Sequence, residues 1–110
     1  MKADLERNLR ETLPVPLTDE EVHEILSSFM DSFTDCANEL RGLTDGTDFT
    51  SIRRITHALK GFASNVGAHD LNALAVTLNA AAHAADSAAC AGHIREILLL
   101  HARYRADLMS

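Results

Sequence analysis

The chain has 110 residues, which is enough for one domain with a single hydrophobic core. Its formal net charge of −6 argues against a general nucleic-acid binder, which needs a basic surface, and against docking on anionic lipid. Hydrophobic residues make up 46% of the chain and aromatic residues only 5%, so aliphatic side chains and alanines must form most of the core. That composition suits helices packed against helices.

The sequence carries no signal for secretion or for a membrane span. Residues 1–7 are charged and lack the apolar stretch of a signal peptide. The longest aliphatic run, at 97–100, is far too short to cross a bilayer. Cys36 and Cys90 match no metal-ligand spacing, so we expect two buried, reduced thiols. Together these features predict a soluble cytoplasmic protein with no metal of its own.

Helical periodicity and breaking residues divide the chain into five expected helices. The first covers about 3–13, with leucines spaced four residues apart, and the prolines within 14–16 end it. The second covers about 19–41. Thr18 is a good N-cap residue and Glu21 follows three residues later, so we predict a capping box at the start of the second helix.

The other three helices are expected to run from 48 or 50 to 65, over 69–85 and over 88–108. Gly67 supplies the break between the third and the fourth, and the polar pair at 86–87 marks the last boundary. Because short loops join long helices, consecutive helices should be antiparallel.

We therefore predict an all-α fold in which residues 1–110 form one domain. Residues 18–109 should form an antiparallel up-down four-helix bundle. Residues 1–16 should add a short N-terminal helix and a proline-rich turn that cap one end of the bundle or lie across it.

The third helix has two chemically distinct faces. Successive helical residues turn by about 100°, so side chains three or four positions apart share a face. The core face should comprise Ile52, Ile55, Leu59, Phe62 and Val66. The opposite, solvent face should comprise Thr50, Arg53, Arg54, His57, Lys60, Gly61 and Ser64. His57 is thus expected to be exposed in the middle of the helix, among basic residues.

The turn at Gly67 folds the fourth helix back along the third and sets Asn79 near His57. The side-chain carbonyl of Asn79 could accept a hydrogen bond from Nδ1–H of the imidazole, which would fix the tautomer and leave Nε2 free as a nucleophile. His83 lies one turn further along the same helix and is expected to border this patch.

This arrangement suits phosphoryl transfer to nitrogen. A neutral imidazole is a good nucleophile near neutral pH, and the transfer depends mainly on positioning and charge stabilisation. Lys60 can neutralise phosphoryl oxygens, and Gly61 removes a side chain that would obstruct a partner. Arg53 and Arg54 either contact an acidic partner or form an ordinary solvated face. Because no phosphate-binding loop or carboxylate cluster is present, we expect no ATP use, no metal and no cofactor.

The run at 57–68, extended by Leu71 and Leu74, resembles the histidine-containing phosphotransfer (HPt) domain of multistep two-component phosphorelays. Gly67 matches the turn glycine of that family. The resemblance implies a four-helix bundle that shuttles phosphoryl groups between the aspartates of receiver domains. It implies response-regulator receivers and a sensor histidine kinase as partners, with the required Mg²⁺ held by the receiver.

The resemblance also implies a role for each matching residue. His57 matches the phosphoacceptor, Lys60 the neighbouring lysine, and Gly61 the glycine that gives access to the histidine. Two residues depart from the family pattern. Phe62 occupies a position that is often small, and we expect it to fill core space. Asn79 stands where the family often has Glu or Gln, so its shorter side chain reaches less far toward the imidazole.

The leading hypothesis is a phosphorelay carrier without kinase activity, monomeric and bound to neither nucleic acid nor membrane. Arg53, Arg54, Ser64 and His83 would contact the partner. The alternative is a helical module that binds and sequesters receiver domains without phosphotransfer, which would not need His57. A histidine-kinase dimerisation domain is a third possibility, but the chain lacks nucleotide-binding motifs.

Overall fold

The computed structural model describes residues 2–108, and every regular element in that range is a helix. The helices are α1 (Lys2–Thr12), α2 (Asp19–Arg41), α3 (Phe49–Val66), α4 (His69–His83) and α5 (Ser87–Leu108). The all-α prediction is therefore confirmed. The largest difference from the expected boundaries is at the end of α4, which stops at His83 instead of 85. The expected last residue of the bundle, 109, lies outside the described residues.

Local sequence sets the start of α2 as expected. The hydroxyl of Thr18 accepts a hydrogen bond from the backbone N–H of Glu21 at 3.1 Å. The Glu21 carboxylate accepts one in return from the backbone N–H of Thr18 at 3.0 Å. This reciprocal capping box satisfies two donors that the first turn of a helix leaves unpaired. Hydrogen bonding of the Glu21 carboxylate with the backbone and the side chain of Thr18 also holds the pKa of this carboxyl below its usual value, because it favours the ionised form.

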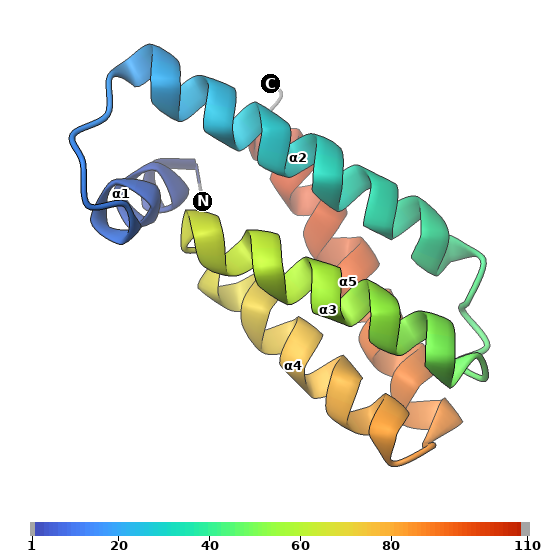
Figure 1. The fold of residues 1–110 in the computed structure, drawn as a ribbon. Coiled ribbons are helices and arrows are strands. Elements are labelled where there is room, and N and C mark those ends of the chain that lie inside the picture. The colour runs from blue at the N-terminus through green and yellow to red at the C-terminus, as the bar shows by residue number, and fades with distance from the viewer. Residues whose placement is uncertain (1, 109–110) are drawn as a thin grey trace.

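The four long helices pack in the cyclic order α2, α3, α4, α5, with α5 returning to α2. In Figure 1 the chain reverses direction between α2 and α3 and again between α3 and α4. The α3–α4 pair makes the most extensive contact in the molecule. Helix α1 lies across one end of the long helices, beside the turn between α3 and α4 (Figure 1).

Gly67 explains both the tight α3–α4 turn and the place of α1. Its φ of 70° is left-handed, and the N–H groups of Gly67 and Ala68 bond back to the carbonyls of Ser64 at 3.3 Å and Ala63 at 2.9 Å. This is a Schellman cap, which favours glycine because it has no side chain to clash. The Gly67 carbonyl accepts from the amide of Asn8 in α1 at 3.1 Å.

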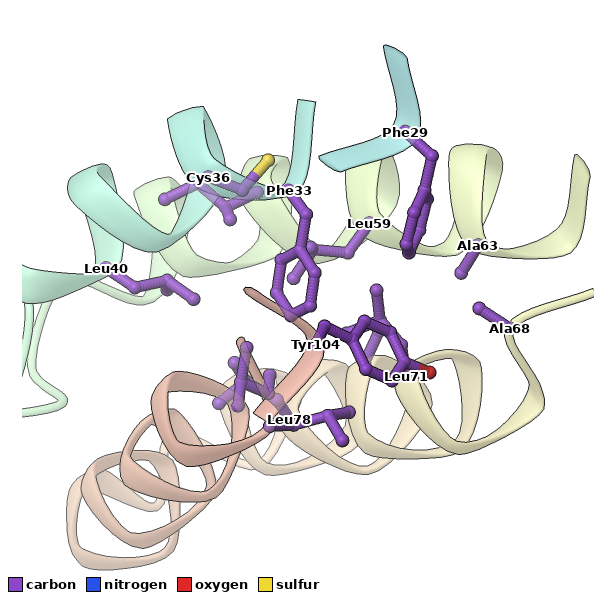
Figure 2. Packing of buried hydrophobic residues seen from close by; sticks show 14 of the residues in the cluster. Phe29, Phe33, Cys36, Leu40, Leu59, Ala63, Ala68, Leu71, Leu78 and Tyr104 are labelled. Carbon is purple, nitrogen blue, oxygen red and sulfur yellow. The ribbon is translucent and has the colours of Figure 1, made fainter. Parts of the chain in front are cut away.

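The core fills the space enclosed by the long helices. Figure 2 shows Phe29 and Phe33 from α2 meeting Tyr104 from α5 among buried leucines and alanines. Phe62 is half-buried and meets the Phe29 ring edge-on at 5.8 Å, so it lies on the core side as expected. Few aromatic rings suffice because alanines and leucines let the helices approach closely.

Cys36 and Cys90 are buried free thiols, as the sequence predicted. Burial and the nearby carboxylates of Glu39 and Asp35 raise the pKa of Cys36 to about 11. No helix among residues 2–108 is long and apolar enough to cross a membrane.

Candidate functional site

His57 projects from the middle of α3 into solvent. The opposite side of the same helix is anchored by five buried aliphatic side chains, none of them more than 4% exposed. These are Ile52, Ile55, Leu59, Ala63 and Val66. A well-anchored helix therefore presents the imidazole to solvent. The imidazole ring of His57 makes no hydrogen bond to any group within the described part of the chain.

An open hollow of about 440 Å³ lies beside His57, between α3 and α4. Its lining combines basic and polar side chains from both helices. They are Thr50, Arg53, Arg54, His57, Lys60, Asn79 and His83. No carboxylate is among these lining residues, although the whole chain carries a formal net charge of −6. The hollow is therefore a locally cationic site on an acidic protein, which suits an incoming phosphoryl group.

Lys60 lies one turn after His57 on the same face, and its side chain is half-buried. It forms no ion pair with any of the described residues, so its ammonium group is available to an external anion. Arg53 is exposed and is likewise unpaired within residues 2–108. These two cations can face a phosphoryl group or an acidic partner without first breaking an internal bond.

Arg54 lies on the exposed face of α3 as expected, but it is paired within the protein. Its guanidinium donates to the Glu39 carboxylate of α2 at 2.7 Å, and this hydrogen bond raises the Arg54 pKa. The side chain still borders the hollow, but its charge is already paired within the protein. Because both side chains are largely exposed, the pair contributes little to stability, and Arg54 can exchange Glu39 for a partner's carboxylate.

Gly61 and Ser64 lie on the same face of α3 but do not line the hollow. A Cβ built on Gly61 would meet nothing within 4 Å, so nothing inside the protein requires glycine at this position. The Ser64 hydroxyl lies 3.5 Å from the amide oxygen of Asn72 in α4, a long contact at the edge of a hydrogen bond. Ser64 is exposed and remains free to contact a partner.

Asn79 shares the hollow with His57, but its oxygen is engaged elsewhere. Its Oδ1 accepts from the hydroxyl of Thr56 at 3.0 Å, not from the imidazole. The expected Asn79–His57 hydrogen bond is therefore not formed. The buried Thr56 hydroxyl occupies this oxygen instead, across the contact between α3 and α4.

The role of Thr56 is not evident from the sequence, because this residue falls between the core face and the solvent face of α3. It is fully buried, with 0% of its surface exposed. A signal was present in the helix phase, since Thr56 is three and seven residues before the buried Leu59 and Ala63. A hydroxyl on that stripe needs a polar partner from the facing helix.

The family model for the Hpt domain matches residues 24–107. The chain belongs to this family. Hpt domains are histidine-containing phosphotransfer modules of phosphorelays, which carry phosphoryl groups without being kinases. They interact with receiver domains and histidine kinases. The match begins within α2 and ends within α5, so it spans the four long helices and leaves α1 outside. No curated protein and no solved structure matches the chain.

Over residues 2–108 no group of three or more His, Cys, Asp or Glu side chains is arranged to hold a metal ion. The residues of the hollow are nitrogen-rich and cationic, and such a lining favours an anion over a metal. The chemistry available to this Hpt domain therefore rests on the imidazole and the surrounding cations.

Proposed function

We propose that this Hpt domain accepts a phosphoryl group on His57 from a receiver-domain aspartate, or directly from a kinase, and passes it to another receiver. One observation carries the proposal: an exposed imidazole on a rigid helix stands beside a hollow lined by cations and no carboxylate. The half-buried Lys60 is the cation one turn away and has no partner among residues 2–108.

In the transfer, the lone pair of Nε2 of a neutral His57 imidazole attacks the phosphorus of the aspartyl phosphate. The new P–N bond forms while the P–O bond to the aspartate breaks, and the aspartate carboxylate leaves with the electron pair. Nδ1 keeps its proton, so the ring carries the formal positive charge of the adduct. The reverse sequence of steps delivers the group to the next receiver.

Each neighbouring residue would contribute differently. Lys60 would offset charge on the phosphoryl oxygens, and Gly61 would leave room for the partner's active site. Arg53, Ser64 and His83 would contact the partner, and Arg54 would do so after release from Glu39. Because such contacts with an acidic partner act at long range, they should raise the association rate more than the affinity.

We further infer that the chain is a single domain, an antiparallel up-down four-helix bundle capped by its N-terminal helix, and that it acts as a monomer in the cytoplasm. The protein needs no cofactor of its own, because the partner receiver supplies the Mg²⁺. Its partners are response-regulator receivers and a sensor histidine kinase, and neither nucleic acid nor membrane is involved.

The test is phosphoryl transfer from an acetyl-phosphate-charged receiver to the wild type and to His57→Gln. We expect acid-labile, base-stable label on the wild type and none on the variant. His23→Gln is the matched control, because His23 is an exposed helical histidine outside the cationic hollow. Receiver binding without label on any variant, across several receivers from the same cell, would instead indicate a sequestering module.

A further inference from the structure

The buried hydroxyl of Thr56 connects α3 to the cationic hollow. Its Oγ lies 2.9 Å from the backbone carbonyl of Arg53 and 3.0 Å from Oδ1 of Asn79. A hydroxyl has a single proton and can donate fully to only one of these two oxygens. The choice between them decides which end of the Asn79 amide faces the hollow.

The two acceptors are not equivalent. In an α-helix the Arg53 carbonyl already accepts from the backbone N–H of His57, four residues later. Oδ1 of Asn79 has no other donor among the described residues, so the Thr56 proton is its only internal partner. Donation to Asn79 is therefore favoured, because it gives each oxygen one donor, whereas donation to the Arg53 carbonyl adds a second donor to an oxygen that already has one.

Anchoring Oδ1 on Thr56 turns the other end of the amide toward the hollow. The Asn79 NH₂ group carries two N–H donors, and neither has an acceptor within residues 2–108. Asn79 lines the same hollow as His57 and Lys60. Donors directed into a cationic hollow beside a nucleophilic nitrogen are arranged for anionic oxygens.

We propose that Asn79 donates a hydrogen bond to the phosphoryl group on phosphorylated His57, and that Thr56 is the residue that positions its amide. This rests on the proposed function in assigning the phosphoryl group to His57. It differs from the role expected from sequence, in which the oxygen of Asn79 orients the imidazole. Here the oxygen is held inside the protein and the nitrogen serves the bound group.

The opposite amide orientation makes distinct predictions. If the amide were rotated by 180°, its NH₂ would donate to Thr56, and Oδ1 would face the hollow. That oxygen would repel a phosphoryl group and would favour Nδ1–H of the imidazole. An experiment must therefore report on the Asn79 amide itself as well as on the phosphoryl group.

The experiment charges the full chain with phosphoramidate, which requires no receiver. Nε2 of His57 displaces ammonia from phosphorus, so one P–N bond breaks and another forms. ¹⁵N NMR should show the Asn79 side-chain amide moving on phosphorylation, with the resonance assigned by its loss in Asn79→Ala. His57→Gln should abolish the movement.

A ³¹P titration of the charged protein supplies the second readout. A donor to the phosphoryl dianion lowers the pH at which that group takes up a proton. The titration midpoint should therefore rise by roughly half a pH unit in Asn79→Ala and in Thr56→Val, and stay at the wild-type value in Thr56→Ser. Thr56→Ser keeps the hydroxyl and loses the methyl group, so a wild-type midpoint in this variant would assign the effect to the hydroxyl and not to side-chain packing.

Matched controls come from α4. Thr77→Val removes a hydroxyl bonded to its own helix, to the Ala73 carbonyl at 2.9 Å, and Asn72→Ala removes an amide two turns before Asn79. Both controls should leave the ³¹P midpoint unchanged. An Asn79 amide that stays still on phosphorylation, or an Asn79→Ala midpoint equal to wild type, overturns the proposal. Failure of receivers to exchange phosphate with a chain that shows both effects would count against the proposed function alone.

Discussion

Gly61 is the residue at which stability and function are expected to conflict. A Cβ there would meet nothing within 4 Å, and an exposed glycine inside a helix costs about 0.5–1 kcal/mol relative to alanine. Gly61→Ala should therefore raise the free energy of unfolding by about that amount while slowing phosphoryl transfer several-fold, because a methyl group would meet the partner. Urea unfolding and single-turnover transfer measure the two effects. A variant that is both more stable and equally fast would remove the access role from Gly61.

Lys60 is expected to act on the phosphoryl group through its charge. Lys60→Gln keeps most of the side-chain length but removes the charge, and we expect transfer from a receiver to slow by about tenfold, or about 1.4 kcal/mol in the barrier. Arg53→Gln is the control, because it removes an equal charge from the rim of the same hollow. Arg53→Gln should change mainly how the transfer rate depends on receiver concentration. If both variants lost the same factor in the single-turnover rate, the total positive charge of the hollow, and not the position of Lys60, would explain the effect.

At the scale of elements, the α3–α4 turn depends on one glycine. A Cβ on Gly67 would lie 2.8 Å from the Thr12 hydroxyl and 3.0 Å from the Asn8 carbonyl, and the φ of 70° is unfavourable for alanine by about 1–2 kcal/mol. Gly67→Ala should therefore lower the unfolding free energy by at least about 1–2 kcal/mol and displace α1. Urea unfolding and amide exchange in α1 check both effects.

Gly42 offers the matched control for the turn. It also ends a helix, but its φ is −84° and a Cβ there would make only an ordinary contact at 3.5 Å. Gly42→Ala should change stability little. If the two glycine variants lost equal stability, strain at the left-handed position would not be the explanation.

For the whole molecule, His101 links stability to pH. It is 2% exposed on α5, and its Nε2 lies 2.9 Å from the Thr34 hydroxyl of α2. Burial, with Arg41 and Arg105 nearby, lowers its pKa below 6.5. Between the folded pKa and pH 6.5, His101 is therefore protonated in the unfolded chain and neutral in the folded chain. The stabilisation is complete above pH 6.5 and is lost as the pH falls through the lower, folded pKa.

The expected loss is at most about 1.4 kcal/mol per pH unit below pH 6.5. Urea unfolding of the wild type at several pH values between 7.5 and 5 should show this slope, and His101→Gln should flatten it. His69→Gln is the control, because His69 is exposed. An unchanged slope in His101→Gln would assign the acid sensitivity to other groups.

The local features of this protein followed from the sequence alone. The approximate boundaries of the helices, the capping box at Thr18, the turn at Gly67 and the outward direction of His57 all depend on residues within a few positions of one another. Helix periodicity and capping act over that range, so a short segment of sequence is enough to predict these features. The cationic face of α3 was predictable for the same reason.

Only the tertiary structure decided which partner each polar side chain takes. Asn79 could reach His57 or Thr56, and Arg54 could face solvent or Glu39, and the sequence holds no distance between helices that would separate these choices. The place of α1 was open as well, until the contact of Asn8 with Gly67 set it at the end of α3. Such competitions are settled by the spacing and rotation of packed helices, because a hydrogen bond tolerates only a few tenths of an ångström.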